Sequence, residues 1–157
     1  PGGVHGSISP DSIHDLPQRF AVMQAEANLR GMELLWENVC WCALRRPEDI
    51  RRAAELLPGL GYVLDVKQAF RGGQDVFDML TAMGENVRHV HLLDWREDGT
   101  LCLPGEGVLD FDRLLRQLRD QGFDGALMLE PYAYQGMNED ALRRSLDFLR
   151  NKIAAAR

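Results

Sequence analysis

Four residues whose side chains can move protons or bind metal ions each follow a short apolar run. They are Glu37, Asp65, His91 and Glu130, and the runs before them have the length of β-strands. An acid at the C-terminal tip of a buried strand is badly placed for packing and well placed for chemistry. Three carboxylates and one imidazole form an oxygen-rich set, which suits Mn²⁺, Mg²⁺ or Co²⁺, whereas a thiolate-rich set suits zinc. These four residues are the first candidates for a functional site.

The elements that must position these residues alternate between strands and helices. Apolar residues at helical spacing predict helices over 14–30, 47–57, 76–83 and 111–121 and from about 138 onward. Buried strands are predicted between them, over 32–36, 62–64, 87–90 and 126–129. The segments 67–74 and 92–109 are interpreted as loops, with Asp94 as a turn residue. This alternation predicts an α/β fold with a parallel sheet, in a single domain over residues 1–157.

The polar strand tips favour a (β/α)8 barrel over an open sheet. A barrel directs the ends of all its strands at one axis, and the G-x-G-x-x-G turn typical of an open dinucleotide-binding sheet is absent. A complete barrel needs about 250 residues, and this chain has 157. We therefore expect half of a barrel, with about four strand–helix units and one preceding helix.

Composition restricts the classes of partner. The net charge of −6 and the lack of a basic stripe argue against a nucleic-acid binder. No apolar run reaches membrane-spanning length, which predicts a soluble protein without a membrane partner. The cysteines Cys40, Cys42 and Cys102 are odd in number, which indicates reduced thiols and a cytoplasmic location.

Five segments, taken in order, resemble one known family. They are LLWENV, VLDVKQA, VRHVHLLD, LPGEGVLDF and GFDGALMLEPY, between Gly31 and Tyr132. This order resembles the xylose isomerase-like TIM-barrel superfamily, and within it the sugar phosphate isomerase/epimerase group. The first segment matches the fifth strand of that barrel, and Pro1–Gly3 resembles the segment after the fourth. The resemblance thus implies the C-terminal half of a barrel whose first four strands are missing from this sequence.

The resemblance also implies a chemistry. A divalent ion, with Mn²⁺ favoured and Mg²⁺, Co²⁺ or Zn²⁺ as alternatives, would be bound by Glu37, Asp65, His91 and Glu130. A sugar or sugar phosphate would bind the ion through a carbonyl and a neighbouring hydroxyl, and the enediolate formed on proton loss would be stabilised. Glu37 and Glu130 would be the acid–base groups of an isomerase or epimerase. A dehydratase or a hydroxypyruvate-type isomerase is the alternative within the superfamily.

One position departs from the family pattern, and three more are candidates for substrate binding. The family often has Asp-x-x-His at the sixth strand, whereas this chain has Gln68 three residues after Asp65. Glutamine does not replace histidine as a ligand or base. Gln68 and Lys67 are candidates for binding a substrate hydroxyl, Arg96 for a phosphate or carboxylate, and Trp41 for a wall of the pocket.

A different class of function is a half-barrel that is catalytically inactive and serves binding or assembly. An open half-barrel exposes sheet edges and an apolar flank. We therefore expect either a homo-oligomer or association with the missing N-terminal half-barrel.

Overall fold

A computed structural model describes residues 10–131 and 138–156 of the chain. Pro1–Gly3 and Tyr132, which carry part of the family resemblance, lie outside the described residues. The elements in chain order are the 3-10 helix η1 (Pro10–Asp15), α1 (Leu16–Leu29), β1 (Leu35–Glu37), α2 (Pro47–Leu56), β2 (Gly61–Asp65), α3 (Val66–Arg71), α4 (Val76–Met83), the 3-10 helix η2 (Gly84–Asn86), β3 (Val87–Leu92), β4 (Asp94–Trp95), β5 (Leu101–Cys102), α5 (Phe111–Asp120), β6 (Ala126–Leu129) and α6 (Glu139–Ala155).

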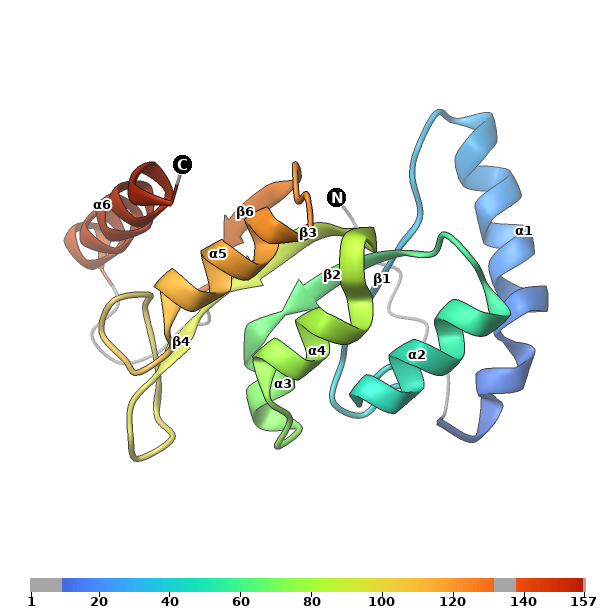
Figure 1. Cartoon of the computed structure of the whole chain (residues 1–157), viewed down its shortest axis with the longest axis horizontal. Helices are drawn as coiled ribbons and strands as arrows, with labels where there is room; N and C mark the ends of the chain where they lie inside the picture. The colour runs from blue at the N-terminus through green and yellow to red at the C-terminus, as the bar shows by residue number, and fades with distance from the viewer. Residues whose placement is uncertain (1–9, 132–137, 157) are drawn as a thin grey trace.

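Four of the strands form one parallel sheet in the order β1-β2-β3-β6. Figure 1 shows α2, α4 and α5 in front of this sheet, with α1 and α6 at opposite ends of the molecule. A TIM barrel has eight parallel strands that are connected through helices, and this sheet has four. The sheet and its helices therefore form a partial TIM barrel. The predicted α/β half-barrel fold is thereby confirmed.

The hydrophobic core lies between the sheet and its helices. Successive strand residues point to opposite faces, and the outward-facing residues of β2 and β3 pack against α2, α4 and α5. This core includes Tyr62, Leu64, Val90, Ile50, Met79, Leu80 and Leu114. The alternate residues of the same strands point to the inner face, where the candidate functional side chains lie. Within the described part of the chain, no helix has the length and apolar character needed to cross a membrane.

The two outer strands of the sheet differ from the prediction. Both β1 and β6 were predicted to be buried, but β1 is half-buried throughout and β6 exposes Ala126. Each of these strands has a neighbouring strand on one side only within the described residues. Its other edge is therefore open, and its side chains are less buried than those of a strand inside a sheet. The strand β1 also begins at Leu35, because Met32 is 55% exposed and makes no strand pairing with β2.

Both segments that were interpreted as loops contain regular structure. Residues 66–71 form the helix α3, because the Asp65 carboxylate accepts a hydrogen bond from the Gln68 backbone N–H at 3.0 Å and caps the helix. Residues 94–102 form an antiparallel hairpin, β4–β5. Its Trp95 ring stacks on Phe70 of α3 with 4.4 Å between ring centroids, so the hairpin packs over the C-terminal end of the sheet.

Asp94, predicted to be a turn residue, is instead the first residue of β4 and pairs with Cys102. Its carboxylate is buried and accepts hydrogen bonds from the backbone N–H groups of Gly105, Gly107 and Leu109 at 3.0–3.2 Å. A methyl group on Gly107 would lie 2.3 Å from the Trp95 carbonyl oxygen, so only glycine fits this close approach. Asp94 thus organises the loop that follows the hairpin.

Candidate metal site

The four candidate residues lie at the C-terminal ends of the four parallel strands. Glu37 ends β1, Asp65 ends β2, His91 is next to last in β3, and Glu130 directly follows β6. Asp65 pairs with His91 in the register of the sheet. The Glu130 backbone N–H continues the ladder to the Leu92 carbonyl oxygen at 3.1 Å. The parallel register therefore brings all four residues to one edge of the sheet.

The functional atoms of these residues converge on the His91 ring. Its Nδ1 lies 3.4 Å from Glu130 Oε2, and 3.9 Å from both Glu37 Oε1 and Asp65 Oδ2. Ligand atoms of Glu37, Asp65 and His91 all lie within 4.8 Å of one another. We call these four residues the carboxylate–histidine cluster.

Two atoms of the cluster are buried without a hydrogen-bond partner among the described residues. They are Asp65 Oδ2 and His91 Nδ1. Native structures leave few such atoms, and each one calls for an explanation such as an ion. A carboxylate oxygen and an imidazole nitrogen side by side, with two more carboxylates next to them, are a donor set that fits a divalent cation.

Asn38, which the sequence analysis did not single out, fastens β1 to β2 beside the cluster. Its side chain is buried, donates to the Asp65 carbonyl oxygen at 2.9 Å and accepts from the Asp65 backbone N–H at 2.7 Å. The amide thus replaces one rung of the strand ladder where β1 has ended. Asparagine directly after an acid-tipped strand was the only sequence signal for this role.

Lys67 lies inside the cluster. Its side chain is only 1% exposed, and its Nζ is 3.4 Å from Asp65 Oδ2 and 3.3 Å from Glu130 Oε2. Lys67 was predicted to lie in a loop and to bind a substrate hydroxyl. The structure instead places its ammonium group between two of the candidate metal ligands.

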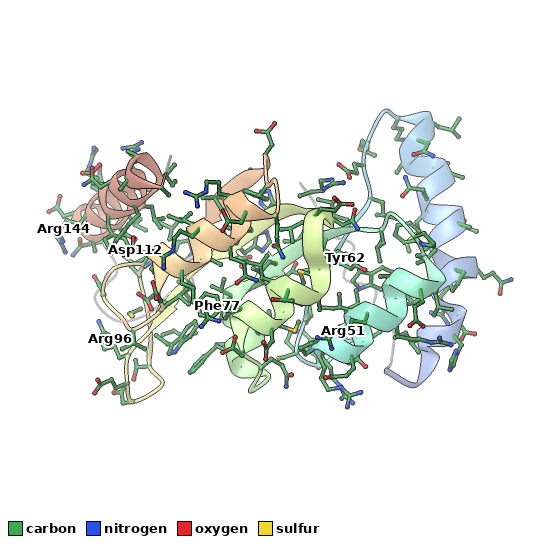
Figure 2. The ribbon with its side chains drawn as sticks, viewed as in Figure 1. Arg51, Tyr62, Phe77, Arg96, Asp112 and Arg144 are labelled. Atoms are coloured by element: carbon green, nitrogen blue, oxygen red, sulfur yellow. The ribbon has the colours of Figure 1, made fainter. Side chains whose placement is uncertain are left out.

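The other three substrate-binding candidates lie differently. The Gln68 side chain is buried and its Oε1 accepts from the Cys40 backbone N–H at 3.4 Å, which braces the loop after β1. Trp41 in that loop is 61% exposed. Arg96 pairs with Glu106 at 3.1 Å, and Figure 2 shows it on the hairpin, well away from Tyr62 of β2. A role of Arg96 in binding a substrate phosphate or carboxylate stays a prediction.

Burial and mutual repulsion perturb the acids of the cluster. Burial raises the pKa of Glu37 to about 7, and the nearby Asp65 and Glu130 carboxylates add to this shift. Burial also raises the pKa of Asp65, against the opposing effect of the Lys67 charge. His89 lies one layer deeper on the same face, with its ring edge-on to His91 at 5.0 Å, and burial lowers its pKa. Acids that resist ionisation at neutral pH are typical of functional sites.

Comparison with known proteins agrees with this architecture. The family model described as "Xylose isomerase-like TIM barrel" matches residues 2–152. The chain belongs to this family. An inosose dehydratase from Geobacillus kaustophilus is 26% identical, over 76% of this chain and 48% of its own. A fructoselysine 3-epimerase from Escherichia coli O157:H7 is 29% identical, over 65% of this chain and 38% of its own. The chain thus spans less than half the length of these two relatives.

A solved structure shows the same fold. The IolI protein with a bound zinc atom superposes with a TM-score of 0.70 at 18% identity, over 100% of this chain and 62% of its own. The superposition spans the half-barrel described above. At this level of identity the likeness concerns the fold alone.

Asn38 can be tested by its effect on stability. Asn38→Ala leaves the backbone N–H and C=O of Asp65 unpaired, so we expect a loss of about 2–4 kcal/mol in the free energy of unfolding. Urea denaturation measures this loss. The matched control is Asn28→Ala on the exposed face of α1, where the side chain accepts a hydrogen bond from Gln24. Equal stability of the two variants would contradict the role given to Asn38.

The raised pKa of Glu37 predicts a pH dependence in protein treated with a chelator. Between the unfolded value of 4.5 and about 7, the folded chain keeps a proton that the unfolded chain releases. The free energy of unfolding therefore falls as pH rises through this window, by an amount on the order of 2 kcal/mol. Glu37→Gln removes this contribution, so its stability relative to wild type should be higher at pH 8 than at pH 5.

Urea denaturation at the two pH values measures the effect. Glu33→Gln is the control, because this carboxylate at the start of the same segment is 60% exposed and pairs with Arg88. It should follow the wild-type curve. A constant difference between Glu37→Gln and wild type at both pH values would show that Glu37 ionises normally.

Proposed function

We propose that this chain carries the metal-binding half of a divalent-metal-dependent isomerase or epimerase that acts on a sugar or sugar phosphate. The observation that carries the proposal is the convergence of three carboxylates on His91. Asp65 Oδ2 and His91 Nδ1 are buried there without a hydrogen bond among the described residues, and Lys67 is the ion-pair partner of Asp65 Oδ2. Membership of the family and the epimerase among the relatives support it. We take residues 1–157 to act as one domain.

The ligands of the ion in this proposal are Glu37, Asp65, His91 and Glu130, and Mn²⁺ is the favoured ion. A bound divalent cation would supply positive charge that stabilises negative charge on a substrate oxygen. Asp65 is the most firmly held ligand, because its backbone is bonded to Asn38 and its second carboxylate oxygen caps α3. The ligand geometry is thus set by backbone contacts of the strand ends.

Glu37 and Glu130 are the proposed acid–base groups. In the chain without an ion, burial and the neighbouring carboxylates raise the pKa of Glu37 to about 7. A carboxyl group in this position can serve proton transfer at a carbon next to a carbonyl. Glu130 is held through its Oε2 by Lys67 and is 33% exposed, so it is accessible from the open face. Removal of a proton by one acid and its return by the other gives epimerisation, and return to the neighbouring carbon gives isomerisation.

Dehydration is the second candidate reaction. It is favoured by the inosose dehydratase among the relatives. The same two acids would serve, with one of them protonating the departing hydroxyl. A cytoplasmic location and the absence of a nucleic-acid partner remain part of the proposal, on the composition given above.

A binding or assembly role is the candidate from another class. The half-buried outer strands β1 and β6 can pair with further strands, either of a second copy or of an N-terminal half-barrel. Gln68 supports this candidate, since it stands where the family often has a histidine and is bonded to the Cys40 backbone. Measurements of metal binding and of proton exchange separate these roles.

Metal binding is the first test. Calorimetric titration of the chelator-treated chain with MnCl₂ at pH 8 should give about one ion per chain. Glu130→Gln should weaken binding at least tenfold, or about 1.4 kcal/mol. Glu139→Gln, at the exposed start of α6, is the control and should bind as wild type does. Absence of binding to Mn²⁺, Mg²⁺, Co²⁺ and Zn²⁺ would refute the metal site.

Proton exchange is the second test and separates the reactions. In D₂O with Mn²⁺, an isomerase or epimerase exchanges the hydrogen next to the carbonyl of its ketose, which NMR detects as loss of one signal. A dehydratase instead releases water from inosose and forms a conjugated product that absorbs in the ultraviolet. Glu130→Gln should slow either reaction by about 10²-fold or more, and Glu139→Gln should not. A metal-bound chain that does neither, with any ketose or inosose, would favour the binding role.

A further inference from the structure

We propose that Lys67 is a resident cation of the carboxylate–histidine cluster, which competes with a divalent ion for the Asp65 and Glu130 oxygens and so weakens ion binding. This inference rests on the proposed metal site. It adds a residue whose charge sets the affinity of that site and makes the ion exchangeable.

The geometry shows that lysine and ion need the same atoms. Lys67 Nζ contacts Asp65 Oδ2 at 3.4 Å and Glu130 Oε2 at 3.3 Å. These are the same two oxygens that face His91 Nδ1, at 3.9 and 3.4 Å. Any ion held between them and His91 therefore lies next to the ammonium group.

Burial makes the competition strong. The Lys67 and Asp65 side chains are each only 1% exposed, so water screens their charges weakly. A buried ammonium group is stable only with anionic partners, and Asp65 and Glu130 are those partners. A divalent ion that takes over these oxygens weakens both ion pairs and brings a second positive charge close to the first.

The charge balance indicates what Lys67 contributes. With its three carboxyl groups ionised, the cluster and Lys67 together carry a charge of −2, which a divalent ion neutralises. Without Lys67 the cluster carries −3, and the loaded site would remain negative. A neutral loaded site accommodates the negative charge that develops on a substrate oxygen better than a negative one does. Lys67 thus lowers the affinity of the site for the ion and makes the loaded site electrically neutral.

The choice of lysine stands out in this chain. Of its eighteen lysines and arginines only two are lysines, Lys67 and Lys152. An ammonium group is compact and sits on a flexible stem, whereas a guanidinium is a wide planar fork. A compact group fits between two carboxylates and can shift when an ion enters.

Lys67→Met tests the proposal, because methionine has a similar length and no charge. In calorimetric titration with MnCl₂ at pH 8, this variant should bind Mn²⁺ at least tenfold more tightly than wild type. The control is Lys152→Met, which removes the other lysine, on α6, where it pairs with Asp112. It should bind Mn²⁺ as wild type does. Equal or weaker binding by Lys67→Met would overturn the competition.

A measurement on the unaltered chain avoids dependence on the variant's folding. Side-chain NMR of protein labelled with ¹⁵N-lysine reports both ammonium groups, and Lys152→Met assigns them. The Lys67 signal should shift with saturation as diamagnetic Zn²⁺ is added, while the Lys152 signal stays in place. An unchanged Lys67 signal at full Zn²⁺ occupancy would show that the ion and the lysine do not share oxygens.

The outcomes separate this inference from the proposed function. Binding to wild type with no gain in Lys67→Met overturns the competition and leaves the metal site standing. Binding to Lys67→Met alone supports the competition and removes the metal-dependent function of the native chain. Binding to neither protein overturns both.

Discussion

The pairing of β1, β2 and β3 at their C-terminal ends is the constraint on which the candidate site depends. Asp65 and His91 are direct partners in the register, so their side chains leave the sheet side by side on its inner face. Beyond the end of β1, the ladder continues through the Asn38 side chain, which binds both backbone groups of Asp65. A shift of the strand register by one residue would point the Asp65 side chain toward the helix-covered core. This shift would destroy both the site and the packing of the core.

The electrostatics of the cluster follow from this enforced proximity. Carboxylates that are buried next to one another resist ionisation, which is why the pKa of Glu37 rises to about 7. Lys67 offsets part of that cost from within α3, and α3 itself exists because Asp65 caps its first turn. One aspartate thus acts as strand terminus, helix cap and candidate ligand. The backbone hydrogen bond from Gln68 holds the Asp65 carboxylate in place, and Lys67 supplies the opposite charge beside it.

The same arrangement explains the unequal burial of the strands. β2 and β3 are covered on both sides within the sheet, whereas β1 and β6 are its outer strands and remain half-buried. A TIM barrel closes by pairing every strand on both sides. The outer strands of this partial barrel are therefore the surfaces at which further strands would complete it, and the cluster lies on the face that such closure would enclose.

The sequence by itself determined the alternation of the four sheet strands with helices, the parallel sheet, the family and the positions of the four strand-tip residues. Hydrophobic periodicity and polar residues at strand ends are local features of the sequence, and the structure has strands and helices where these features predict them. Only the tertiary structure decided how the site is built, because it depends on contacts between distant segments. Asn38 reaches across 27 positions to Asp65, and Lys67 reaches across 63 to Glu130. The α3 helix was missed because a side-chain cap overrides weak local propensity. The ion pair of Arg96 with Glu106 likewise depends on how the hairpin and the loop after it fold together.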